Sequence, residues 1–118
     1  MNESVSNAGT VFDVIKKGFE AAEVAVDSLR SVVESLNTAR SVVVTVANHT
    51  GEPLQLHSHH HDHGNFRPTN APGLIAERAS VAFGSQSKAG SLATGTEGRV
   101  VYAGRDFDVV LHWNNPFV

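Results

Sequence analysis

Five histidines lie within seven residues near the middle of the chain, in the stretch HSHHHDHG that begins at residue 57. Imidazoles together with a carboxylate are suitable ligands for Zn²⁺, Ni²⁺ or Cu²⁺. In an extended strand, alternate side chains share a face, which makes His57, His59, His61 and His63 candidate metal ligands. A specific site also needs outer partners that fix the imidazole rotamers. A solvated tract that chelates metal only adventitiously is therefore the alternative.

The same stretch does not predict catalysis. Ser58, His59 and Asp62 are close in sequence, but they lack a nucleophile elbow and an oxyanion element. The glycines of GTEG and GSQSKAG lack the spacing of a phosphate-binding loop, so they are interpreted as turn residues. We therefore predict that the protein is not an enzyme and requires no cofactor.

Composition narrows the class of protein. With 118 residues, 41% hydrophobic residues and 18% charged residues, the chain fits one small globular domain. A net charge of −3 gives no basic surface for nucleic acid, and the absence of cysteine excludes disulfides and zinc-thiolate sites. No standard signal peptide precedes the first apolar stripe. No apolar run approaches the roughly 20 residues of a simple transmembrane helix.

Residues 1–40 are expected to form an amphipathic helix and a linker. Apolar residues recur there at steps of three and four, which is the period of one helix face. The stripe consists of Phe12, Ile15, Phe19, Ala22, Val26, Leu29, Val33 and Leu36. A packing face is the usual use of such a stripe.

Residues 41–118 have the character of β-structure. SVVVTVAN, LQLHS, LIAERASVAFG, GRVVYA and FDVVLHW are expected to form about five or six short strands, with turns and loops rich in Gly, Pro and Asn between them. The expected fold class is α+β, with the helix followed by an antiparallel β-sandwich. Since the sequence leaves off directly after a strong strand, the sandwich is expected to be incomplete at its C-terminal end.

Three blocks of the sequence resemble the actinoporins, the pore-forming cytolysins of sea anemones, and the related fungal fruit-body lectins. They are VAVDSLRSVVESLNTARSVVVTVANHTGEPL, GSLATGTEGRVVYA and DVVLHWNNPFV, and the resemblance covers roughly residues 11–118. It implies a β-sandwich that docks on membranes containing sphingomyelin or another phosphocholine lipid. The N-terminal helix would then detach and insert. Because its charged face forbids a lone crossing, insertion would require a homo-oligomer around water.

The resemblance also implies which residues face the membrane. His63 and Glu97 fall where the family has a serine and a valine of its lipid pocket, and Pro116 matches a loop proline. The predicted membrane-facing set is His63, Gly64, Glu97, Trp113, Pro116 and Phe117. Near this end, protonated histidines would attract anionic headgroups at acidic pH, which is a third interpretation of the histidine tract.

Membrane binding and permeabilisation is thus the predicted function. The alternatives are a carbohydrate-binding module of the lectin type, with a glycan partner, and a histidine-rich metal-binding protein. The resemblance implies a secreted or membrane-associated protein that is soluble before it binds the membrane.

Overall fold

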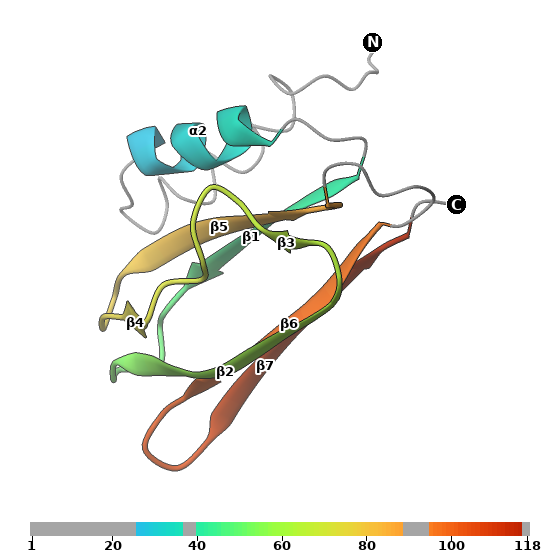
Figure 1. Ribbon diagram of the computed structural model, residues 1–118. Helices are drawn as coiled ribbons and strands as arrows, with labels where there is room; N and C mark the ends of the chain where they lie inside the picture. Colours follow the sequence, from blue (N-terminus) through green and yellow to red (C-terminus); the bar gives the residue numbers. More distant parts are fainter. Residues whose placement is uncertain (1–25, 37–39, 89–94, 117–118) are drawn as a thin grey trace, which may run out of the picture.

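The structure, a computed structural model, describes residues 26–36, 40–88 and 95–116. These residues form a helix and seven strands (Figure 1). The elements are α2 (Val26–Ser35), β1 (Ser41–Ala47), β2 (Leu54–His63), β3 (Asn65–Phe66), β4 (Leu74–Ile75), β5 (Ser80–Gln86), β6 (Thr96–Ala103) and β7 (Asp108–Asn115).

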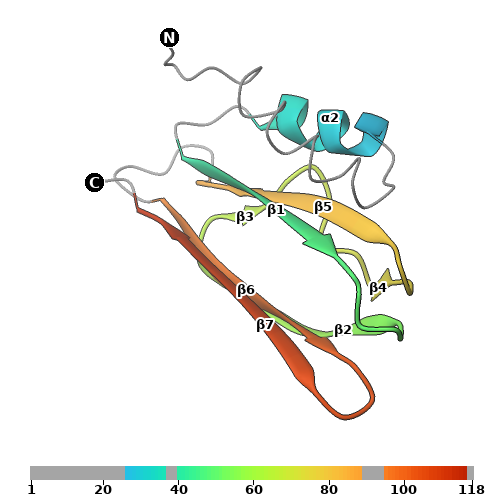
Figure 2. The same ribbon diagram turned by 180° about the vertical axis from the view of Figure 1, so that it is seen from behind.

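The strands form two antiparallel sheets that face each other. One sheet has three strands in the order β1-β5-β3, and the other has four in the order β4-β2-β6-β7. Figures 1 and 2 show the two sheets as separate layers, with α2 on the far side of the three-stranded layer. β6 pairs with both β2 and β7, so these three strands make a continuous surface.

The α+β class expected from the sequence is wrong. The described residues are mainly antiparallel β-structure, and their helix has ten residues, Val26–Ser35. The predicted stripe from Phe12 to Leu36 reaches the described residues only at its C-terminal part; Phe12, Ile15, Phe19 and Ala22 lie outside them. The helix ends at Ser35, where the Leu36 amide donates instead to the carbonyl of Val33 at 3.3 Å, a turn rather than a continued helix.

The hydrophobic core lies between the sheets. Both sheets contribute to it: Phe83 comes from β5, while Ile75, Val100, Tyr102 and others come from the four-stranded sheet. The Tyr102 hydroxyl donates to the carbonyl of Pro72 at 2.7 Å, and burial raises the pKa of Tyr102 to about 12. Along β6, buried residues such as Val100 and Tyr102 alternate with more exposed ones. This period of two is the pattern by which the sequence predicts a strand here.

The described helix packs on the outer face of the three-stranded sheet. Leu29 and Val32 are buried, and Leu36 lies over Gly84 of β5. A Cβ at residue 84 would lie only 3.0 Å from the Leu36 side chain, so glycine permits this close approach. This part of the stripe therefore serves packing. None of the helices among the described residues is long and apolar enough to cross a membrane.

Asn48 fixes the turn that follows β1. Its side chain is 1% exposed, and its amide nitrogen lies 2.9 Å, 3.0 Å and 3.1 Å from the carbonyl oxygens of Glu52, Ile75 and Ala76. Its amide oxygen accepts from the Thr50 hydroxyl at 2.7 Å and from the Thr50 amide at 3.1 Å. One side chain thus joins the β1–β2 turn to the segment after β4.

Candidate functional site

The histidine tract forms a strand rather than a loop, because β2 continues to His63. Nine residues of β2, Gln55–His63, lie against seven residues of β6, Glu97–Ala103, since the register shifts between Leu56 and Ser58 and again between His61 and His63. His57 and Asp62 have no paired residue on β6. Each such bulge interrupts the alternation of faces. The four odd-numbered histidines therefore do not share one face.

His59 and His61 point toward the three-stranded sheet. Their rings lie 5.4 Å and 4.6 Å from the ring of Phe66, each in an edge-to-face arrangement. His61 also contacts the ring of Trp113 at 5.3 Å, and Phe66 in turn contacts Phe83 at 5.8 Å. Edge-to-face packing is favourable for aromatic rings at these separations. These two imidazoles are thus part of the contact between the sheets.

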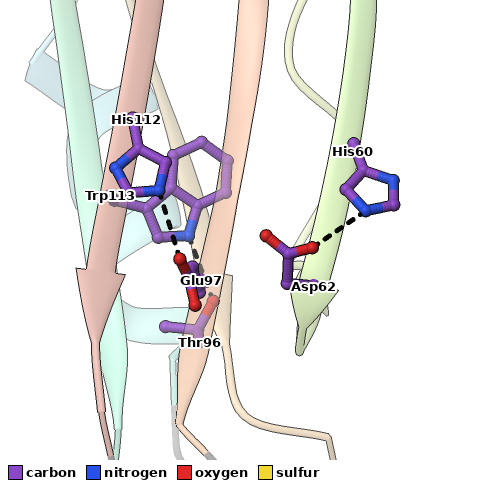
Figure 3. Close-up of polar contacts among 6 residues, drawn as sticks. All are labelled: His60, Asp62, Thr96, Glu97, His112 and Trp113. Carbon is purple, nitrogen blue, oxygen red and sulfur yellow. Dashed lines mark hydrogen bonds and ion pairs between the residues drawn. The ribbon is translucent and has the colours of Figure 1, made fainter.

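A buried polar network stands beside these rings. The Trp113 indole N–H donates to Oγ1 of Thr96 at 3.1 Å (Figure 3), and Thr96 Oγ1 lies 2.5 Å from Oγ of Ser85. Ser85 Oγ lies 2.7 Å from Nε2 of His61 and 3.2 Å from the carbonyl of Asn65. Ser85 and Thr96 are almost fully buried, so their hydroxyls depend on these partners. The network ties β5 to β2, β6 and β7.

This position makes His61 costly to protonate. Burial lowers the pKa of His61, the neighbouring His59 and His60 lower it further together with Lys88, and Asp62 opposes them. The unfolded chain therefore binds a proton at His61 at a higher pH than the folded chain does. Stability contributed by His61 is complete above about pH 6.5 and falls as the pH decreases toward the lowered pKa.

We therefore expect the free energy of unfolding to decline less steeply in His61→Gln than in the wild type as the pH falls from about 7 to about 5. Glutamine keeps a hydrogen-bonding group toward Ser85 and removes the titration. Urea denaturation at a series of pH values measures this slope, with His49→Gln, which changes an exposed histidine, as the control. If the free energy of unfolding falls equally steeply with pH in the wild type and in His61→Gln, the loss of stability at acidic pH is not due to His61.

A second set of side chains lies on the opposite face of the same strands. His60 bonds to Asp62 at 3.1 Å, and His112 of β7 bonds to Glu97 of β6 at 3.3 Å (Figure 3). His60 and His112 both face Arg99 across the strands, since the register pairs His60 with Arg99 and Arg99 with His112. Sequence reasoning missed Arg99 and His112, which only the strand register places beside the tract.

Five of the six residues predicted to face the membrane come together at one end of the four-stranded sheet. His63 pairs with Glu97, and Gly64 lies against Thr96, the residue before Glu97. Trp113 bonds to the same Thr96, and Pro116 follows directly after β7. Phe117 lies outside the described residues. We call this region the Trp113 end of the sheet, defined by His63, Gly64, Glu97, Trp113 and Pro116.

The predicted metal ligands are not brought together. His59 and His61 point inward, whereas His63 pairs with Glu97. Within residues 26–36, 40–88 and 95–116, no group of three or more histidine, cysteine, aspartate or glutamate side chains is placed to hold a metal ion.

No protein-family model matches the sequence, and a search of curated proteins returns no match. Among solved structures, the chain is similar to the crystal structure of the lipid binding protein Nakanori, with a TM-score of 0.69 and 26% sequence identity. The similarity covers 83% of this chain and 47% of the Nakanori chain, so this chain spans about half of that protein's length.

Proposed function

We propose that this protein binds lipid, and that the Trp113 end of the four-stranded sheet is where it does so. The observation that carries the proposal is the similarity to a lipid binding protein over 83% of the chain at a TM-score of 0.69. The convergence of His63, Gly64, Glu97, Trp113 and Pro116 supports the location. Trp113 and Thr96 are buried there, whereas the neighbouring residues His63, Asn114 and Pro116 are exposed.

The headgroup that we propose is phosphocholine, as in sphingomyelin or phosphatidylcholine, on the resemblance of the sequence to actinoporins. Pore formation by an oligomer remains a prediction of the same resemblance. Leu29 and Val32 are buried against the three-stranded sheet, so insertion of this part of the chain would require α2 to leave the sheet. Docking and insertion are therefore separate steps, and vesicle sedimentation and dye release measure them separately.

The double variant Asn114→Glu/Pro116→Glu should bind sphingomyelin-containing vesicles at least about tenfold more weakly than the wild type, because a carboxylate loses its hydration at a membrane interface. Both side chains are exposed, so folding should be little affected. Co-sedimentation at neutral pH measures the change.

Leu74→Glu is the matched control. Leu74 is a 52% exposed apolar residue on β4, which pairs with the start of β2 and so lies at the other end of the same sheet. If Leu74→Glu weakens vesicle binding as much as the double variant does, the Trp113 end is not the binding site. If the wild type binds no vesicle of any composition but binds glycans on an array, the lectin alternative replaces the proposal.

A further inference from the structure

The outer face of the four-stranded sheet is open among the described residues. α2 lies over the three-stranded sheet, on the opposite side of the molecule (Figures 1 and 2). Side chains on this outer face alternate with the core residues Val100, Tyr102 and Trp113. They come from β2, β6 and β7, the three strands that pair continuously.

A row of three basic or titratable side chains crosses this face. His60, Arg99 and His112 occupy directly opposite positions on β2, β6 and β7. Opposite residues on neighbouring antiparallel strands have Cβ atoms only about 5 Å apart. All three side chains are exposed, and Arg99 makes no hydrogen bond or ion pair with any residue that the structure describes. We call this set the His60–Arg99–His112 row.

The sign of charge on the row depends on pH. Asp62 pairs with His60, and Glu97 pairs with His112. With neutral imidazoles, Arg99 stands against two carboxylates, a net charge of −1; with both imidazoles protonated, the net charge is +1. His63, which pairs with Glu97, adds a further positive charge, while Asp108 lies at the far end of β7. Histidine is the side chain that makes this change between about pH 8 and pH 5.

An apolar pair borders the row. Val101 and Val110 face each other in the next outward position along β6 and β7, and Val110 is 60% exposed. A surface with cations beside exposed aliphatic side chains suits the boundary of a membrane, where charged headgroups adjoin apolar chains. An anion in solution would gain nothing from the valines, so charge and apolarity together favour a lipid surface as the occupant.

We infer that the outer face of the β2-β6-β7 strands docks on anionic lipid membranes when the pH is acidic, through the His60–Arg99–His112 row. This inference rests on the proposed lipid binding and adds to it a second contact surface and a condition under which it operates. The Trp113 end belongs to the same sheet and adjoins the row, since its residue Glu97 bonds to His112.

The test compares phosphatidylcholine vesicles with and without phosphatidylserine, at about pH 7.5 and about pH 5.5. Each cation near an anionic surface strengthens binding roughly fivefold, less at high salt. We expect acidification to strengthen binding to phosphatidylserine vesicles about tenfold or more. The double variant His60→Gln/His112→Gln should lose most of this gain, and the control His49→Gln, in the turn after β1, should keep it.

Arg99→Gln provides a second, independent variant. The charge of Arg99 does not change over this pH range. Arg99→Gln should therefore weaken binding to phosphatidylserine vesicles at about pH 5.5, where the row docks, and much less at about pH 7.5. Circular dichroism at each pH shows whether every variant is folded. His61 is present in all of the variants, so the effect of acid on His61 is the same in each and cancels when they are compared. If His60→Gln/His112→Gln is unfolded at about pH 5.5, two other measurements test the inference. They are the effect of Arg99→Gln on binding and the weakening of binding at high salt.

The outcomes separate this inference from the proposed function. Absence of binding to any phosphocholine vesicle at about pH 7.5 would refute the proposed function and leave the acid-dependent gain to be judged on its own. An acid-dependent gain that survives in His60→Gln/His112→Gln, or that is equal on vesicles of phosphatidylcholine alone, would overturn the inference.

Discussion

Replacing Asn48 by alanine is expected to lower the free energy of unfolding by about 2 to 4 kcal/mol. The Asn48 amide reaches the carbonyls of Glu52, Ile75 and Ala76 and accepts two hydrogen bonds from Thr50. Alanine would remove all of these hydrogen bonds, and the carbonyl of Ile75, a fully buried residue, would lose the Asn48 donor. An unpaired buried carbonyl costs more than the mean value of a hydrogen bond. Chemical denaturation monitored by circular dichroism measures the change.

Two further variants make this expectation specific. Asn48→Asp keeps the shape of the side chain but replaces the NH₂ donor by an oxygen, so it should destabilise at least as much as alanine does. Asn70→Ala, in an exposed position, should change stability by no more than about 0.5 kcal/mol. A small loss for Asn48→Ala, similar to that of Asn70→Ala, would show that the turn after β1 does not depend on this side chain.

Replacing Gly64 by alanine should cost about 3 kcal/mol or more. Gly64 has a φ angle of 87°, in the region that side chains with a Cβ rarely adopt. A Cβ at this position would also collide with the backbone carbonyl of Gln86 and would lie 2.9 Å from Oγ1 of Thr96. The Gln86 backbone and the buried Thr96 hydroxyl would both have to move to make room, and that movement would break the network between Ser85 and Thr96.

Gly51 separates the two causes. It has a φ angle of 83°, nearly that of Gly64, but a Cβ there would meet nothing within 4 Å. Gly51→Ala should therefore cost only about 1 to 2 kcal/mol, the price of the backbone conformation. The difference between the two variants, measured by urea denaturation, isolates the steric part. Equal losses at the two positions would show that Gly64 is not crowded by Gln86 and Thr96.

The positions of most strands could be predicted from the sequence, because their signals are local. SVVVTVAN gives β1, and GRVVYA and FDVVLHW lie within or around β6 and β7. LIAERASVAFG covers β4 and the first five residues of β5. The α+β class is wrong because the described residues are mainly antiparallel β-structure, and the described part of the apolar stripe is a ten-residue helix whose Leu29 and Val32 pack against a sheet.

The arrangement of the histidines could not be predicted in the same way. The alternation rule assumes one residue on each strand per pair, and nothing in HSHHHDHG marks His57 and Asp62 as the unpaired positions. Likewise, Arg99 and His112 are far from His60 in the sequence, and only the register brings them opposite it. The convergence of His63, Gly64 and Glu97 was expected only through the family resemblance, since the spacing of these residues does not reveal it.

The surplus of residues in β2 bears on how relatives of this protein should be aligned. Nine residues of β2 cover seven of β6, and the two extra residues are accommodated between paired positions rather than in a turn. The histidine segment can therefore gain or lose residues without changing the number of residues of β6 that it covers. We expect homologous sequences to differ by one or two residues inside this segment while the flanking core positions, Leu54 and Phe66, stay equivalent. Alignment gaps belong within the strand itself, and gaps moved to the neighbouring loop would assign the histidines to the wrong face.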